Sequence, residues 1–172
     1  SRGAHAQREI GLAVGEAPTS KGYPSSVFSM LPKLIERTGT GEGSEGTITA
    51  IYTVLAEGDD LNDPIVDLAR ASLDGQIALN RELADAGHFP AIDISGSVSR
   101  LMPLLIEKEN QQLALNFRRM WSIYEENKDL IRVGAYQPGS DPELDQAISK
   151  KDQVMEFLRQ DMNESAKICL LY

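Results

Sequence analysis

The order of apolar and polar positions along the chain predicts two helices, then a group of strands, then helices again. Ile10 and Val14 lie four residues apart in segment 7–15, which is the spacing of one face of a helix. A loop rich in proline, glycine and hydroxyl side chains follows, and a second helix is predicted from residue 24 to about residue 37. The expected buried stripe of that helix is Val27, Met30, Leu31, Leu34 and Ile35.

Three later segments have the β-branched and apolar composition of strands. Segment 47–55 is apolar on both faces at its middle, which is typical of a central strand in a covered sheet. Segment 71–79 predicts a turn into another buried strand, and segment 91–94 predicts a short strand. Between these two, segment 80–86 predicts a short helix that Gly87 ends. Helices and strands mixed in this way indicate an α/β fold.

After about residue 103 the pattern is helical throughout. Segment 103–128 predicts one long helix. The sequence 141–143, a capping aspartate followed by proline, predicts the start of another helix. We interpret the periodic apolar positions as a core seam and not as an aromatic binding site. These positions are Leu113, Phe117, Met120 or Trp121, Tyr124, Leu144, Ala147, Ile148, Val154, Phe157 and Leu158.

Composition narrows the classes of function. The chain has 172 residues, enough to bury a real core, and a net charge of −9, which argues against nonspecific binding of nucleic acid. The one cysteine, Cys169, excludes an internal disulfide framework and fits a reducing compartment. The sequence has no apolar run long enough to cross a bilayer and no basic start followed by an apolar leader. We therefore expect neither a transmembrane segment nor a nucleic-acid partner.

The glycine-rich segment 38–46 invites two phosphate-binding motifs that its context rejects. Gly41, Gly43 and Gly46 satisfy G-x-G-x-x-G, but they lie between a predicted helix and a predicted strand, the reverse of a dinucleotide fingerprint. Gly41 and Gly46 also have the spacing of a P-loop, yet Thr47 stands where lysine is required. The segment therefore predicts a solvated loop.

Acidic residues cluster shortly before Pro64, where Glu57, Asp59, Asp60 and Asp63 suggest a metal site. They lack the spacing of a calcium-binding loop, with its glycine and closing glutamate. Asp63 directly precedes a proline, so we favour a helix cap in a solvated loop and expect no metal.

No catalytic constellation is complete in these residues. His5 and His88 are far apart in the sequence, and we interpret both as structural or incidental. The strongest candidate is segment 87–100, in which a short apolar strand ends in small residues at 95–97 and leads to Arg100. Its guanidinium carries a planar fork of donors that suits phosphate oxygens. On the residues alone, a structural ion pair is the commoner role for an arginine.

Several blocks of the sequence resemble the flagellum-specific ATPase family of type III protein export, which is similar to the catalytic subunits of rotary ATP synthases. The resemblance covers nearly the whole chain in order, through the blocks Ala6–Glu16, Ser20–Pro24, Val54–Asp60, Leu73–Gly75 and Gly87–Arg100. Three later blocks favour the flagellar branch over the injectisome branch, namely Gly134–Tyr136, Gly139–Pro142 and Leu144-Asp145.

The resemblance implies a fold and a division of the chain. Residues 1–102 would be the C-terminal part of a RecA-like P-loop NTPase domain with a mainly parallel sheet and helices. Residues 103–172 would be an all-helical C-terminal domain. The P-loop, the catalytic glutamate and the metal-associated aspartate of the family belong to a segment preceding the part matched here. The departures at Gly3 and His5 leave the first five residues without a clear match, and residues 167–172 match nothing in the family.

The resemblance also implies site residues. Arg100 matches the family's arginine finger, which reaches into the neighbouring subunit's site, and Phe89 matches the aromatic residue, usually tyrosine, that packs on adenine. The implied cofactors are ATP and Mg, bound mainly by residues upstream of this fragment. The implied function is that of a homo-hexameric ATPase that energises flagellar protein export by releasing or unfolding export substrates and chaperones.

The remaining implications concern partners and place. The implied partners are export apparatus proteins and chaperone–substrate complexes, at the cytoplasmic face of the inner membrane, with room for peripheral membrane association. Without the P-loop, the fragment alone is expected to be inactive. The alternative is a noncatalytic interaction module that binds export chaperones or other ATPase subunits.

Overall fold

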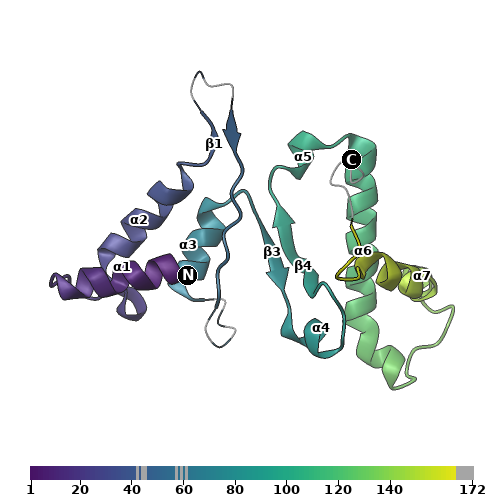
Figure 1. The fold of residues 1–172 in the computed structure, drawn as a ribbon. Helices are drawn as coiled ribbons and strands as arrows, with labels where there is room; N and C mark the ends of the chain where they lie inside the picture. The colour runs from purple at the N-terminus through teal and green to yellow at the C-terminus, as the bar shows by residue number, and fades with distance from the viewer. Residues whose placement is uncertain (42, 44–45, 57, 59, 61, 166–172) are drawn as a thin grey trace. The chain divides into compact units, whose positions relative to one another are not determined.

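The computed structural model describes residues 1–41, 43, 46–56, 58, 60 and 62–165 (Figure 1). The chain forms two compact units, Ser1–Asp74 and Gly75–Tyr172. The predicted domain boundary between residues 102 and 103 falls inside the second unit and stays a prediction. No helix in the described part of the chain is long and apolar enough to cross a membrane. Cys169 and the other residues of segment 167–172 lie outside the described residues.

The first unit is built on helices α1 (Arg2–Ala13), α2 (Ser25–Ile35) and α3 (Pro64–Ser72), with a short 3-10 turn, η1 (Ser20–Gly22), before α2. Helix α2 packs against both α1 and α3. The buried cluster consists of Ala4, Tyr23, Val27 and Ile65, with Phe28 and Leu31 packed against it. The two helices predicted at 7–15 and 24–37 are therefore confirmed, but Ile10, Val14 and Leu34 are exposed.

A close contact explains which face of α1 is buried. A Cβ atom on Gly11 would lie 2.7 Å from Cγ of Pro24, closer than such atoms approach in proteins. The pairing of α1 with the start of α2 therefore uses the faces of Ala4 and Gly11, which are both buried. The four-residue spacing of Ile10 and Val14 therefore identified the helix correctly, but these residues do not lie on its buried face.

The strand predicted at 47–55 is mostly wrong. Only β2 (Thr47–Ile48) forms, paired antiparallel with β1 (Gly39–Thr40), and Ile51 is 92% exposed. Strand backbone needs a neighbour for its N–H and C=O groups, and among the described residues β1 is the neighbour of this segment. The glycines of the preceding loop are exposed, as predicted, and residues 42, 44 and 45 lie outside the described residues.

The helix cap predicted at Asp63 is confirmed. Its Oδ1 accepts hydrogen bonds from the backbone N–H groups of Ile65 at 2.8 Å and Val66 at 3.3 Å. Asp60 accepts from the Lys21 ammonium and from the Asn62 N–H, and these bonds hold the pKa of Asp60 below its usual value. Residues 57 and 59 lie outside the described part of the chain, within which no group of three or more metal-ligating side chains gathers.

The second unit begins with a hairpin of β3 (Gly75–Leu79) and β4 (Ile92–Ser99), joined through the short helix α4 (Arg81–Asp85). The strands are antiparallel, because the turn after α4 brings the chain back and the Asn80 N–H donates to the Ala91 carbonyl at 2.9 Å. Among the described residues the strand pairs are antiparallel, so the expected mainly parallel arrangement is not found here. Nor is β3 buried, since Ile77 and Leu79 are 71% and 74% exposed.

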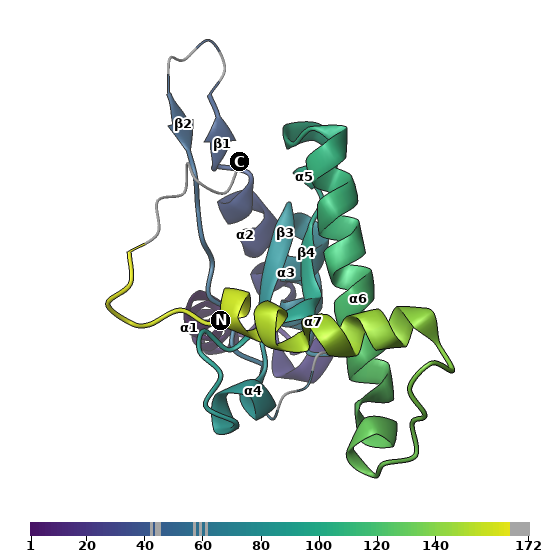
Figure 2. The ribbon, with the colours of Figure 1, turned by 90° about the vertical axis from the view of Figure 1, so that its right-hand side faces the viewer.

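Helices follow the hairpin, as predicted. They are α5 (Met102–Leu105), α6 (Lys108–Arg132) and α7 (Pro142–Leu158). The single helix predicted over 103–128 is broken, because Ile106 and Glu107 are extended before α6 begins. Figure 2 shows α7 lying across α6, and Trp121, Leu144, Ala147 and Val154 are buried there. Mixed helix and sheet followed by an all-helical part confirms the predicted fold class at this level.

The seam predicted between these helices is only partly buried. Leu113 and Phe157 are largely exposed, although the Phe157 ring stands edge-on to that of Phe117 with 5.7 Å between centroids. The cap predicted at Asp141 is confirmed, since its Oδ1 accepts from the N–H groups of Glu143 at 2.9 Å and Leu144 at 3.2 Å.

Candidate functional site

The segment that sequence analysis singled out, 87–100, contains the turn before β4 and the whole of that strand. β4 is longer than predicted, because it continues through the small residues to Ser99. The ladder pairs Ala78 with Asp93 and Gln76 with Val98, so residues 94–97 of β4 lie opposite the single residue Ile77 of β3. The expected small-residue turn is therefore a bulge inside a strand.

Side chains of both strands hold this bulge. Asp93 Oδ1 accepts from the N–H groups of Ser95 at 2.9 Å and Gly96 at 3.1 Å. Ser97 Oγ accepts from the Ala78 N–H at 3.0 Å and donates to the Asp93 carbonyl at 2.6 Å. The Gln76 amide donates to the Gly96 carbonyl at 2.7 Å. The small residues are thus required by hydrogen bonding and close approach, and not by a chain reversal.

Helix α6 adds a contact to the bulge. A terminal guanidinium nitrogen of Arg118 donates to the Ser97 carbonyl at 3.0 Å, in a partly buried position. A Cβ on Gly96 would lie 2.9 Å from Asp93 Oδ2 and 3.1 Å from Ala78 Cβ, so a larger residue there would displace the Asp93 side chain or the neighbouring strand. Sequence reasoning missed Arg118, because no spacing in the sequence joins a helix residue to this strand.

Arg100 directly follows β4 and is exposed. The backbone on both sides of it is fixed. Ser99 pairs with Gly75 in the ladder, and Ser99 Oγ accepts from the Met102 N–H at 3.1 Å, which bridges over Arg100 to the start of α5. An exposed arginine on a held backbone is in a position to meet a group that another molecule presents.

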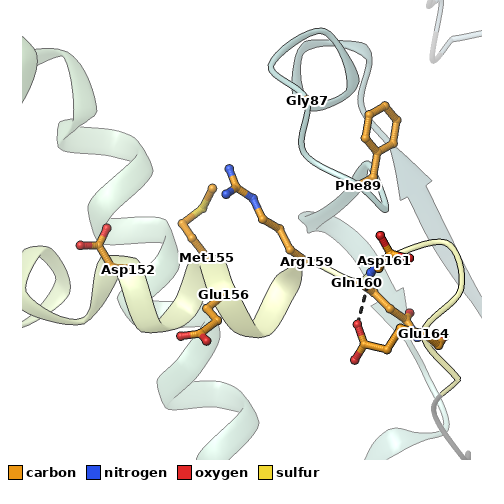
Figure 3. A pocket seen from close by; sticks show the side chains of 9 residues that line it. All are labelled: Gly87, Phe89, Asp152, Met155, Glu156, Arg159, Gln160, Asp161 and Glu164. Carbon is orange, nitrogen blue, oxygen red and sulfur yellow. Dashed lines mark hydrogen bonds between the residues drawn. The ribbon is translucent and has the colours of Figure 1, made fainter.

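Phe89 stands at the other end of β4, on the turn that precedes the strand, and is 58% exposed. It borders an open cavity of about 750 Å³ (Figure 3). Gly87 shares the turn, and the remaining lining residues belong to α7 and the segment after it, namely Asp152, Met155, Glu156, Arg159, Gln160, Asp161 and Glu164. The Gln160 N–H donates to the Phe89 carbonyl at 3.0 Å, which ties this segment to the turn.

The charge of the cavity limits what it can hold. Four of the nine lining residues are acidic, and Arg159 is the one basic residue among them. Such a lining disfavours an anion and suits an uncharged ring that stacks on Phe89. The cavity and Arg100 lie at opposite ends of β4, on the order of 20 Å apart since a strand rises about 3.3 Å per residue. The structure does not bring the two predicted residues into one site.

His88, next to Phe89, is 3% exposed. Its backbone N–H donates to the Leu83 carbonyl at 2.8 Å, and its side-chain Nδ1 has no hydrogen-bond partner. Burial, and then the positive charge of Arg159, hold the pKa of His88 below its ordinary value. The His88 ring is buried in the turn that carries Phe89, and the interpretation of this residue as structural or incidental stays a prediction.

Two family models match the chain. Residues 1–99 match the nucleotide-binding domain of the ATP synthase alpha/beta family, and residues 106–169 match the C-terminal domain of the type III secretion ATPase EscN.

Similar proteins are much longer than this chain. It is 54% identical over 168 residues to the flagellum-specific ATP synthase of Pseudomonas aeruginosa, covering 98% of this chain and 37% of that protein. The assembled ATPase EscN of the enteropathogenic Escherichia coli type III secretion system superimposes with a TM-score of 0.94 at 45% identity, over 99% of this chain and 41% of EscN. EscN in complex with its central stalk EscO gives a TM-score of 0.87 at 42% identity, over 99% and 40% of the two chains.

The burial of His88 makes stability depend on pH. The unfolded chain takes up a proton near the ordinary histidine pKa of about 6.5, whereas the folded chain resists it. The folded pKa is the lower one, so this contribution is complete above pH 6.5 and is lost as the pH falls. We expect the free energy of unfolding to fall between about pH 7.5 and pH 5.5, and to fall less in His88→Gln. Denaturant titrations at several pH values measure both, and equal pH dependence in the two proteins would contradict the assignment.

Proposed function

This chain belongs to the ATP synthase alpha/beta nucleotide-binding family, and we propose that it is the latter part of a hexameric ATPase that energises type III protein export. The observation that carries the proposal is the 54% identity to a flagellum-specific ATP synthase over 98% of the chain. The flagellar branch is the proposed one. Because the chain covers 37% of that relative, the activity is proposed for a longer protein that contains it.

We propose that the longer protein binds ATP and Mg mainly through residues outside this chain. The acidic lining of the cavity at Phe89 supports this, because it suits the base of a nucleotide and would repel a triphosphate. The exposed ring of Phe89 would stack on adenine, while the phosphates would extend toward groups that this chain does not supply. Hydrogen bonding of Gln160 to the Phe89 carbonyl would keep the ring in place.

We propose Arg100 as an arginine finger that acts in the neighbouring subunit. Its exposure and its separation from Phe89 by the length of β4 support the proposal, because one subunit then contributes to two different nucleotide sites. A guanidinium placed beside the transferring phosphoryl group stabilises charge that develops in the transition state. Arg100 would therefore act on turnover more than on nucleotide affinity.

The proposed partners follow from the similar structures. EscN was determined as an assembled ATPase and with its central stalk EscO, which supports a homo-hexamer that meets a stalk of the export apparatus. We propose that export substrates and chaperones meet the helical part of the chain, at the cytoplasmic face of the inner membrane. Release or unfolding of these substrates would be the work that hydrolysis drives.

The test of the function compares the full-length protein with this chain alone. We expect the full-length protein to hydrolyse ATP in the presence of Mg, and this chain to show no turnover, because the phosphate cradle lies outside it. Release of phosphate measures both. Turnover by the purified chain would contradict the division of the site. A preceding segment without a glycine-rich loop ending in Lys and Ser or Thr would favour the noncatalytic interaction module instead.

In the full-length protein, Phe89→Ala should weaken the affinity for ATP by about 1–3 kcal/mol, the scale of a base stacked on an aromatic ring. Phe89→Tyr keeps the stacking face, so its affinity should stay close to the original. Phe157→Ala serves as a matched control, because it removes another exposed phenylalanine outside the cavity. Equilibrium titration with a fluorescent ATP analogue measures all three. Unchanged affinity for ATP in Phe89→Ala would contradict the proposal that the Phe89 ring stacks on adenine.

Replacement of Arg100 should be costly to turnover. A finger supplied by a neighbour is worth roughly 10³ to 10⁵ in rate, or about 4–7 kcal/mol. Arg100→Lys keeps the charge without the planar fork and should also be badly impaired. Steady-state hydrolysis by the full-length variants measures kcat and KM separately.

Mixing experiments test whether Arg100 acts across subunits. One variant lacks the P-loop lysine but keeps Arg100, and the other is Arg100→Ala. A mixture of the two should regain some activity, because some subunit interfaces then combine an intact P-loop with an intact Arg100. If mixed rings form and each variant still mixes productively with the original protein, absence of recovery would refute the assignment.

A further inference from the structure

We propose that Arg118 is a positioning residue for Arg100, through which helix α6 fixes the end of β4. The inference rests on the proposed function, because it takes Arg100 to be the finger. Its basis is the hydrogen bond from the Arg118 guanidinium to the Ser97 carbonyl at 3.0 Å, three residues before Arg100. The helical part of the chain would then help to set the geometry of hydrolysis in a neighbouring subunit.

The bulge is the part of β4 whose register needs holding. Residues 94–97 are opposite a single residue of β3, so they lack the regular ladder bonds that fix the rest of the strand. The hydrogen bonds of Asp93, Gln76 and Ser97 replace them from within the hairpin. The bond from Arg118 comes from outside the hairpin, and it ties this irregular segment to a 25-residue helix.

Between the bulge and Arg100 the chain is stiff. Val98 and Ser99 are paired with Gln76 and Gly75, and a Cβ on Gly75 would lie 2.6 Å from the Val98 carbonyl oxygen. Strands this close leave little room for adjustment. A slip of one residue at the bulge would therefore turn every following side chain to the opposite face of the strand. Arg100 would then leave the position from which it reaches its phosphoryl group.

Arg118 is suited to prevent such a slip. A charged donor makes a stronger hydrogen bond to a carbonyl than a neutral one, and this bond is partly shielded from water. Its neighbour Arg119 does something different, because it makes two hydrogen bonds to the Glu143 carboxylate, at 2.7 and 2.9 Å, with both side chains largely exposed. The two adjacent arginines therefore form a matched pair, one directed to the bulge and one to α7.

The first experiment measures hydrolysis by full-length variants. Arg118→Met keeps the apolar stem and removes the hydrogen-bond donors. We expect kcat to fall about 10-fold, a smaller loss than the roughly 10²-fold that a 1 Å misplacement of a reacting group can cause. KM for ATP should change less than about two-fold, because Phe89 and the cradle are untouched. Arg118→Lys should recover part of the lost rate. Arg119→Met should keep a kcat close to the original, since an exposed ion pair contributes little.

A double variant separates positioning from general stability. If Arg118 acts through Arg100, Arg100→Ala combined with Arg118→Met should be no slower than Arg100→Ala alone. Multiplied losses, or an unchanged kcat in Arg118→Met beside an impaired Arg100→Ala, would overturn the inference and leave the proposed function intact. An unimpaired Arg100→Ala would overturn the finger assignment and this inference together.

Mixed rings guard against misfolding of the variants. Arg118→Met is placed either in the subunit that lacks the P-loop lysine and supplies Arg100, or in the Arg100→Ala subunit that supplies the cradle. We expect loss of recovered activity in the first arrangement and normal recovery in the second. Equal losses in the two arrangements would overturn the inference, because a folding defect affects both alike.

Discussion

The close approach of β3 and β4 is the constraint on which the placement of both candidate residues depends. Gly75 and Gly96 allow it, since a Cβ at either position would meet atoms of the other strand at 2.6 Å and 3.1 Å respectively. Within that spacing, hydrogen bonds with the side chains of Asp93, Gln76 and Arg118 satisfy backbone groups of the bulge in β4. The position of Phe89 before the strand and of Arg100 after it follows from the same paired backbone.

Separation of the two residues has a chemical meaning. A single site needs its base-binding and phosphate-binding groups within the length of one nucleotide, whereas a strand of eight residues holds Phe89 and Arg100 farther apart than that. If both proposed roles hold, each residue completes a site only when copies of the chain meet edge to edge, and a closed ring is the arrangement in which every such site is completed. The similarity to an assembled export ATPase fits this requirement.

Local signals in the sequence predicted the structure well, and signals that depend on distant partners did not. Asp63 and Asp141 cap their helices as predicted, because a cap needs only the next three residues. Segment 47–55 was predicted as a central strand from composition, but a strand exists only where other strands pair with it. The small residues at 95–97 suggested a turn. A bulge held by side-chain hydrogen bonds uses the same small residues, so the sequence alone does not distinguish the two.

The same division between local signals and distant partners applies to the candidate site. Phe89 and Arg100 were singled out by resemblance, and the structure adds that Phe89 is exposed beside a cavity and that Arg100 is exposed on a held backbone. Arg118 and Gln160 could not be identified, because their partners lie on other elements and no motif links them.

The tie between Gln160 and Phe89 joins one backbone to another, with an N–H on one side and a carbonyl on the other. Every amino acid except proline supplies that N–H, so the tie is indifferent to side-chain identity at position 160. The side chains around it can therefore diverge during evolution while the segment stays attached to the turn. Related proteins could tune the charge of this cavity, and with it their preference among ligands, without redesigning the scaffold that carries it.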